Sequence, residues 1–205
     1  MSSANTPKDW DDLAERVVLH VENYLAGLER CARGEAGSQM VSVLLLEVAQ
    51  VMLAGAQLGA SPDVVLPDNW EPEIGPDPDL DVVRQGLAER LPVVDDYIEV
   101  FDPYKDVETT SYRLSDDLVD VASDLVHGLR HFKAGRTMEA LWWWQYSYLN
   151  HWGNHGGAAL RALHAVVSGV RLDVAEERLV DAEPVDPAEA TEPTGQPKPA
   201  DLVTT

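Results

Sequence analysis

The residues best suited to chemistry lie in the last third of the chain, in the stretch EALWWWQYSYLNHWGNHGG at residues 139–157. His151 and His155 are four residues apart, so a helix would present both imidazoles on one face, where they could bind one metal ion. A zinc protease motif also requires a glutamate directly after the first histidine, and Trp152 stands there instead. Tyr148 lies beside the histidines and adds a phenol to this candidate contact for a ligand or partner. Buried, hydrogen-bonded histidines remain the alternative to metal ligands.

A second set of polar side chains follows the helix that precedes this stretch. At 100° per residue, five of them fall within about 80° of arc: Asp117, Asp120, Asp124, His127 and His131. Helical di-metal proteins take carboxylate and histidine ligands from facing helices, but they use Glu-x-x-His pairs, and this sequence contains none. The three aspartates are therefore candidate metal ligands, with a solvated acidic face as the alternative.

Glu47 is a carboxylate inside an apolar segment, MVSVLLLEVAQVMLAGAQLGA. Such a helix is predicted to be buried almost all round, and a buried carboxylate needs a partner or a shifted pKa. The candidate partners are His151, His155, Arg161 or a tyrosine. If Glu47 faces the two histidines, the resulting polar pocket is the best site candidate in the molecule. A buried structural pair is the alternative.

Trp143 differs from the other tryptophans of the same helix. A helical wheel places Trp142, Trp144 and Trp152 on a broad core-facing arc, whereas Trp143 falls on the polar stripe. An aromatic side chain in that position is either covered by a loop or the C-terminal tail, or partly exposed. Exposed tryptophans are common in protein interfaces, so Trp143 is a candidate contact for a partner or ligand.

Helical periodicity and capping residues predict an all-α protein. Apolar residues recur every three or four positions, and Pro7 and Ser115 mark helix starts. The predicted helices, four long and one short, cover residues 7–32, 38–58, 78–91, 115–134 and 137–172. Whether the last helix continues through Gly153, Gly156 and Gly157 stays open, because glycine can either break a helix or admit a close neighbour. The pattern predicts a helical bundle.

The remaining segments are predicted to lack regular structure. Residues 61–79 hold five prolines and form a long acidic connection, and residues 93–104 are ambiguous between a helical turn and a short extended piece. We find no convincing strand pair. Residues 173–205 carry nine acidic and two basic residues, so we expect this tail to be mostly disordered. The helical domain is then a single unit over residues 1–172.

Charge and composition limit the classes of partner. The net charge is −21, from 36 acidic and 15 basic residues, and such a surface disfavours direct nucleic-acid binding. The single cysteine, Cys31, is predicted to be a buried hydrophobe. Glu47, Gln50 and Gln57 interrupt the apolar segment, so we expect no membrane span. The N-terminus has no basic region followed by an apolar core, which predicts a cytoplasmic location.

Several segments together resemble one bacterial family, known as domain of unknown function 5063. The similar segments are LLEVAQVMLAGAQL, EVFDPY, LSDDLVDVASDLVHGL and EALWWWQYSYLNHWGNHGGAALRALH, and the resemblance covers residues 9–172. It implies a helical cytoplasmic domain with no assigned activity, and it adds no catalytic residues.

The sequence contains no phosphate-binding loop, nucleophile elbow or Cys-x-x-Cys pair, so no catalytic motif points to an enzyme and no cofactor is required. We therefore expect an uncharacterised helical protein that works as a protein-binding or regulatory module. Its protein partner and its oligomeric state are unknown. The alternative is a metal-dependent enzyme or small-ligand binder that uses a carboxylate and histidine pocket in the bundle.

Overall fold

The computed structural model describes residues 7–66, 73–100, 104 and 109–171. Its elements in chain order are α1 (Pro7–Ala32), the 3₁₀ turn η1 (Gly37–Gln39), α2 (Met40–Ala60), α3 (Asp81–Arg90), β1 (Asp96–Val100), β2 (Thr109–Arg113), α4 (Leu114–Lys133), α5 (Thr137–Ser147), the π-helical turn η2 (Tyr148–Trp152) and α6 (Gly153–Arg171). The predicted tail at residues 173–205 lies outside the described residues. So do residues 67–72 of the predicted proline-rich connection.

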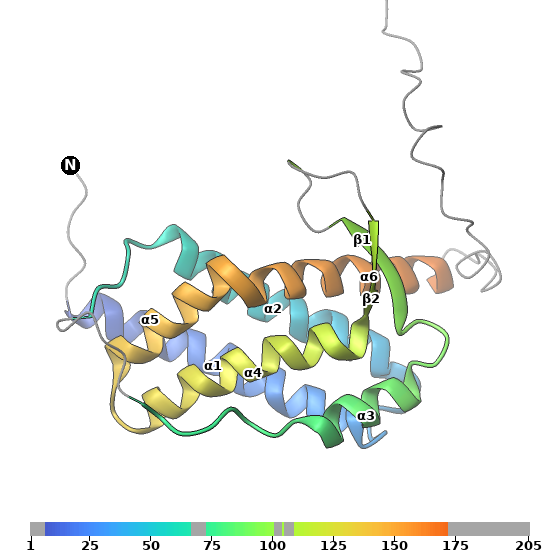
Figure 1. The fold of residues 1–205 in the computed structure, drawn as a ribbon, viewed down its shortest axis with the longest axis horizontal. Helices are drawn as coiled ribbons and strands as arrows, with labels where there is room; N and C mark the ends of the chain where they lie inside the picture. The colour runs from blue at the N-terminus through green and yellow to red at the C-terminus, as the bar shows by residue number, and fades with distance from the viewer. Residues whose placement is uncertain (1–6, 67–72, 101–103, 105–108, 172–205) are drawn as a thin grey trace, which may run out of the picture.

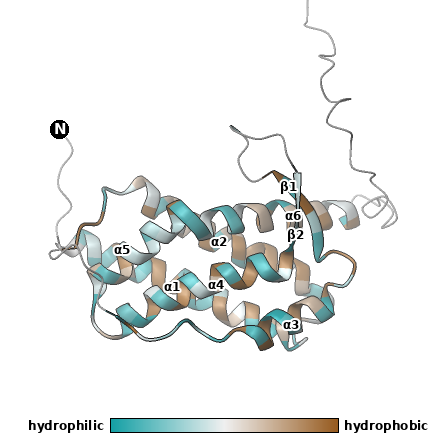
Figure 2. Cartoon of the chain, in the orientation of Figure 1, coloured by the Kyte–Doolittle hydropathy of each residue, from teal (hydrophilic) through white to brown (hydrophobic). Residues whose placement is uncertain are grey.

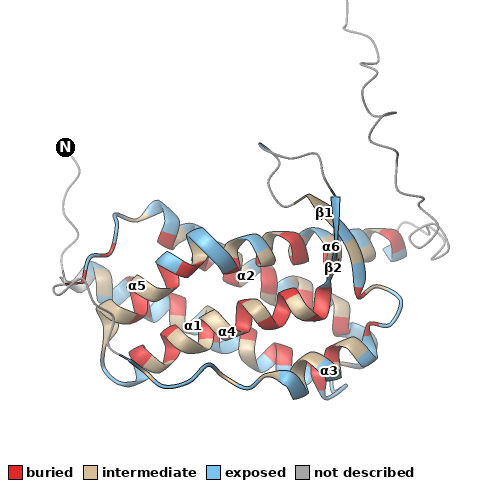
Figure 3. Cartoon of the chain, in the orientation of Figure 1, coloured by how far each residue is buried: buried red, intermediate tan, exposed pale blue. Residues whose placement is uncertain are grey.

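The long helices form a bundle, as the sequence predicted (Figure 1). α1 packs on α2, α2 packs on α6, and α6 packs on α4, while α5 also contacts α1, α2 and α4. The short helix α3 packs against α1 and α4. Apolar and polar residues alternate around each helix (Figure 2), and the buried residues lie between the helices (Figure 3). The fold is therefore mostly helical and built round a shared core.

The buried face of α1 confirms the predicted apolar stripe. Leu13, Val17, Val21, Leu28 and Cys31 are all buried, at the expected spacing of three and four residues. Tyr24 lies on the same stripe, and its hydroxyl donates a hydrogen bond to the carbonyl of Leu118 in α4 at 2.7 Å. This bond satisfies a buried phenol and ties α1 to α4.

One face of α2 is exposed, which corrects the prediction of a helix buried all round. A bundle covers a helix only on the sides where neighbours lie, and α2 has its neighbours along α1 and along the last helix from α5 to α6. Leu46 and Leu53 are 55% and 54% exposed on the uncovered side. Residues 37–60 are the one described helical stretch long and apolar enough to cross a membrane, and 33% of its apolar 18-residue segment is buried inside the protein.

A two-stranded antiparallel sheet joins α3 to α4, so the expectation of no strand pair was wrong. Tyr97 of β1 pairs with Tyr112 of β2, and their ring centroids are 6.1 Å apart. The strands are only five residues each and none of their residues is fully buried. In β1 Tyr97 and Glu99 are half-buried while Ile98 is exposed, so the sequence shows no apolar alternation of period two. Cross-strand pairing and contacts with the bundle stabilise the hairpin instead.

The last helix is continuous from α5 through η2 to α6, because its glycines admit neighbours and do not break it. A Cβ added to Gly156 would lie 2.5 Å from the sulfur of Met52 in α2. A Cβ on Gly55 of α2 would in turn lie 2.4 Å from the ring of Tyr148. Missing side chains therefore bring α2 and the last helix into close contact.

Candidate functional site

Two carboxylate–histidine pairs connect α4 to the last helix. Asp117 Oδ1 lies 2.6 Å from His155 Nδ1, and Asp124 Oδ2 lies 2.7 Å from His151 Nδ1. The pairing order shows that α4 and α6 run antiparallel. Four of the five residues predicted as metal candidates are thus brought together, although they meet as two separate pairs.

Asp117 is the buried centre of a longer chain of hydrogen bonds. Its side chain is only 2% exposed, and its second oxygen accepts a hydrogen bond from the hydroxyl of Tyr97. Burial, followed by this hydrogen bond, raises the pKa of Tyr97. The hydrogen bond to Asp117 raises the pKa of His155, against the opposing effect of burial. Each oxygen of Asp117 therefore has a hydrogen-bond partner, and the carboxylate holds the imidazole of His155 in one orientation.

The second pair is closer to the surface on its histidine side. Asp124 is 13% exposed and His151 is 49% exposed. Burial raises the pKa of Asp124, although hydrogen bonding and charge from His151 lower it. His151 belongs to the π-helical turn η2, and π turns are frequent at functional sites.

The two imidazoles lie next to each other with their ring centroids 4.7 Å apart and their planes at 62°. Each Nδ1 is bound by an aspartate, and within the described part of the chain neither Nε2 has a hydrogen-bond partner. The aspartates therefore fix which nitrogen of each ring is available to a ligand.

Asp120, the fifth metal candidate, is drawn away toward α3. Arg84 contacts Asp116 at 2.7 Å and Asp120 at 3.4 Å. Desolvation lowers the pKa of Arg84, but the hydrogen bonds and charges of Asp116 and Asp120 together raise it above its ordinary value. Across the described residues, no group of three or more His, Cys, Asp or Glu side chains is arranged to hold a metal ion.

Glu47 lies on the other side of α2, against α1. Its Cγ is 2.8 Å from the position of a Cβ built on Gly27. Desolvation raises the pKa of Glu47, whereas the charges of Arg30 and His20 lower it. Glu47 Oε2 is buried and has no hydrogen-bond partner among the described residues. The predicted pocket joining Glu47 to both histidines therefore does not form, because this side of α2 faces a different helix.

Tyr148 is a packing residue between the last helix and α2. Its ring fills the space above Gly55 and Gly59, and its centroid lies 4.8 Å from that of Trp152. This explains the side chain without a ligand.

Trp143 packs on α4. Its ring stacks on His127 at 3.9 Å between centroids, and its indole N–H donates to the carbonyl of Asp124 at 3.0 Å. The next residue, Trp144, donates to the neighbouring carbonyl of Leu125 at 3.1 Å. Trp144 and Trp152 are buried as predicted, whereas Trp142 is only half-buried and stacks on exposed Tyr146.

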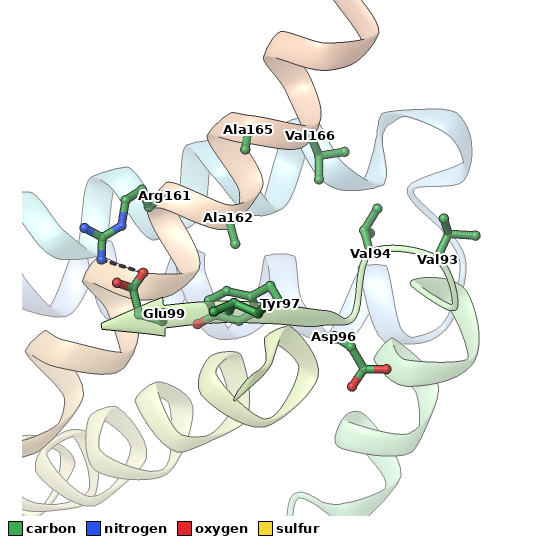
Figure 4. A pocket seen from close by; sticks show the side chains of 10 residues that line it. Val93, Val94, Asp96, Tyr97, Glu99, Arg161, Ala162, Ala165 and Val166 are labelled. Carbon is green, nitrogen blue, oxygen red and sulfur yellow. Dashed lines mark ion pairs between the residues drawn. The ribbon is translucent and has the colours of Figure 1, made fainter. Parts of the chain in front are cut away.

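Sequence reasoning missed a groove between β1 and α6, because it missed the strand. The groove has a volume of about 260 Å³, and Figure 4 shows Tyr97, Ala162 and Val166 lining it. At one end Arg161 forms an ion pair with Glu99 at 2.5 Å. Because Tyr97 also bonds Asp117, one side chain links this groove to the histidine pairs.

Comparison with known proteins gives a family and a fold. The family described as domain of unknown function (DUF5063) matches residues 8–169. The crystal structure of protein BF1032 from Bacteroides fragilis is similar, with 26% sequence identity and a TM-score of 0.62. The similarity covers 76% of this chain and 92% of that chain. No curated protein matches the chain.

Proposed function

The chain belongs to the family described as domain of unknown function (DUF5063), and we propose that it works as a protein-binding module that docks through the exposed face of α2. The first partner that fits this face is a second copy of the chain. We call the exposed row of side chains the α2 seam: Ser42, Leu46, Ala49, Leu53, Ala56 and Ala60.

The spacing of the α2 seam supports a helix as the partner. Its six residues follow one another at intervals of 4, 3, 4, 3 and 4, which is the heptad spacing of a coiled-coil contact. A helix that packs only within its own bundle needs one apolar stripe, which faces the core. It does not need a second apolar row on its exposed side. The seam runs along the helix for about 27 Å.

The order of large and small residues supports a second copy of the chain. If two α2 helices pack antiparallel round a two-fold axis at residue 51, Leu46 faces Ala56 of the other copy and Leu53 faces Ala49. Ser42 then faces Ala60. Each large side chain meets a small one, so the layers interdigitate, and a two-fold interface requires such self-complementarity.

The charge distribution also favours this face as the contact. The chain carries a net charge of −21, yet Glu47 is the only charged residue of α2, and it faces α1. Two copies can therefore bring their α2 seams together without placing like charges within the seam. The rest of the surface still repels a second copy at long range, so added salt should strengthen the association by screening.

A membrane surface is the competing partner for an apolar helix. Helices that lie on membranes carry Lys or Arg on their polar face, and α2 has neither. A net charge of −21 also repels anionic lipids. Crossing the membrane would remove Leu44, Val48 and Val51 from the core that they share with the other helices.

Sedimentation velocity over a wide range of protein concentration tests the proposal. The wild type should change from monomer to dimer, and more readily at higher salt. Leu53→Glu places a charge at the centre of the α2 seam and should keep the protein monomeric. Val82→Glu is the matched control, because Val82 is an 85% exposed apolar residue on α3.

Two results would overturn this proposal. One is a wild type that stays monomeric at every concentration and salt. The other is co-sedimentation with vesicles of neutral or anionic lipid that Leu53→Glu abolishes, since this result would assign α2 to a membrane surface. Helix content by circular dichroism should be equal in all three proteins, so that a change in mass reports docking and not unfolding.

The groove between β1 and α6 favours a second candidate function, binding of a small molecule. Its apolar lining ends at the ion pair of Arg161 with Glu99, and Asp96 also lines it, so an uncharged aromatic molecule such as benzyl alcohol fits its chemistry better than an anion. Saturation-transfer NMR should detect benzyl alcohol on the wild type but not on Ala162→Trp, which fills the groove. Equal transfer to both proteins would exclude the groove as the binding place.

A further inference from the structure

We propose that His151 and His155 together bind a divalent transition-metal ion, such as Zn²⁺, Ni²⁺ or Cu²⁺, through their Nε2 atoms. This inference goes beyond docking through α2 and beyond small-molecule binding in the groove. It rests on the geometry of the two imidazoles and of the carboxylates behind them.

A carboxylate orients each of the two imidazole rings. Asp124 holds Nδ1 of His151 at 2.7 Å, and Asp117 holds Nδ1 of His155 at 2.6 Å. Histidine ligands of metals almost always donate their other ring N–H to a carboxylate, a carbonyl or water in this way. Such a contact fixes the tautomer in which Nε2 carries the free lone pair and makes that nitrogen more basic.

The distance between the two rings also suits a shared metal ion. A metal ion bound to two imidazole nitrogens at about 2.1 Å, with an angle of roughly 90–109°, holds the ring centres roughly 4.6–5.3 Å apart. The observed centroid distance is 4.7 Å. The separation of the rings therefore matches the separation that one shared ion requires.

The surroundings of the two imidazoles are acidic. Asp117 and Asp124 lie directly behind the imidazoles, and Asp120 lies between them on α4. Of these three carboxylates, Asp120 is partly offset by Arg84, which contacts it from α3. A negative environment of this kind attracts a cation and disfavours an anionic ligand.

The remaining coordination positions are open to water. Within the described residues no third side chain completes a metal site with the two histidines, and His151 is half exposed to solvent. Two imidazole ligands suit borderline metals better than Mg²⁺ or Ca²⁺, which prefer oxygen ligands. We therefore expect the two histidines to bind Cu²⁺ more tightly than Zn²⁺.

Titration of the full chain, purified without a histidine tag, tests the site. Calorimetry with Zn²⁺ should show one ion bound per chain. In ¹⁵N NMR of the imidazoles, the chemical shifts of Nε2 of His151 and His155 should change when Zn²⁺ is added. His151→Ala should abolish this saturable binding. Asp124→Asn keeps both ligands and should weaken binding roughly 10- to 100-fold, because it removes the carboxylate behind one ring.

His164→Ala is the matched control, since His164 is an exposed histidine of α6 that contacts Ser168. It should bind Zn²⁺ like the wild type. The proposal is overturned if no stoichiometric ion binds, if His151→Ala binds as tightly as the wild type, or if His164→Ala is weakened equally. Leu53→Glu should keep the ion, so failure of the metal site and failure of α2 docking can be told apart.

Discussion

Asp117 holds His155 at 2.6 Å while lying almost entirely out of solvent, so this carboxylate favours the protonated imidazole in the folded protein. The folded-state pKa of His155 is therefore raised above its ordinary value of 6.5. A group whose pKa rises on folding contributes stability that is fully present below the unfolded pKa and is lost as pH rises through the folded pKa. The raised pKa values of Asp124 and Glu47 act in the same direction, because acidification removes a buried charge.

We accordingly predict that the free energy of unfolding increases as pH is lowered from about 8 to about 6. His155→Gln should flatten this dependence, because the amide can donate to Asp117 but does not titrate. Urea unfolding at several pH values measures the effect. His164→Gln should keep the wild-type slope, and an equal slope in His155→Gln would show that the pair contributes nothing to it.

The close contact at Gly55 predicts opposite effects for two glycine substitutions. Gly55→Ala pushes a methyl group into the rings of Tyr148 and Trp152 and should destabilise the protein by about 1–3 kcal/mol. At Gly157 the nearest atom, in Met52, lies 4.0 Å from an added Cβ. Gly157→Ala should therefore stabilise α6 by about 0.5–1 kcal/mol. Thermal and urea unfolding check both values, and a neutral Gly55→Ala would contradict the packing described.

Gln145 is buried and forms hydrogen bonds to the end of α2 and to the segment that follows it. Its side-chain oxygen accepts from Val64 N at 2.8 Å, and its nitrogen donates to the carbonyls of Leu58 and Pro62. Gln145→Ala leaves these buried groups unpaired and should cost about 1–3 kcal/mol. Hydrogen exchange at the Val64 amide should become faster in this variant. The increase should exceed the increase that the lower free energy of unfolding of the whole protein would cause. In Gln85→Ala, which alters an exposed side chain, the exchange rate should stay unchanged.

Asp95 caps α4 from outside the helix. It is buried, and it accepts hydrogen bonds from the backbone and hydroxyl of Ser115 and from Arg113. Asp95→Asn should lower the free energy of unfolding by about 2 kcal/mol, because the remaining amide cannot accept all of these bonds. Asp96→Asn, at the exposed next residue, is the control. Equal stability of the two variants would exclude this role.

The helices were predictable because their signals are local. Apolar residues at intervals of three and four gave the buried face of α1, and the predicted boundaries of α1, α2 and α4 differ from the observed ones by two residues or fewer. Local signals failed where the partner is distant in sequence. Ser115 was expected to cap α4 itself, whereas Asp95, on the other side of the hairpin, supplies the cap.

The candidate site was predictable only in part, for the same reason. A helical wheel gives the direction of each side chain about its own axis, and it correctly grouped His151 with His155. It does not say which neighbour each face meets. The wheel therefore could not show that Glu47 meets Gly27, nor that the aspartates of α4 meet the imidazoles. The α2 seam was hidden because a helix that is apolar all round has no polar face to mark its exposed side.

A pairing experiment shows whether two α2 helices dock antiparallel. Leu46→Lys and Ala56→Glu each weaken the seam in a homodimer, but in a mixture the introduced lysine of one copy would face the introduced glutamate of the other. We predict that each variant alone sediments mainly as a monomer and that the equimolar mixture forms a heterodimer. A mixture that associates no better than its separate components would contradict the antiparallel docking of α2.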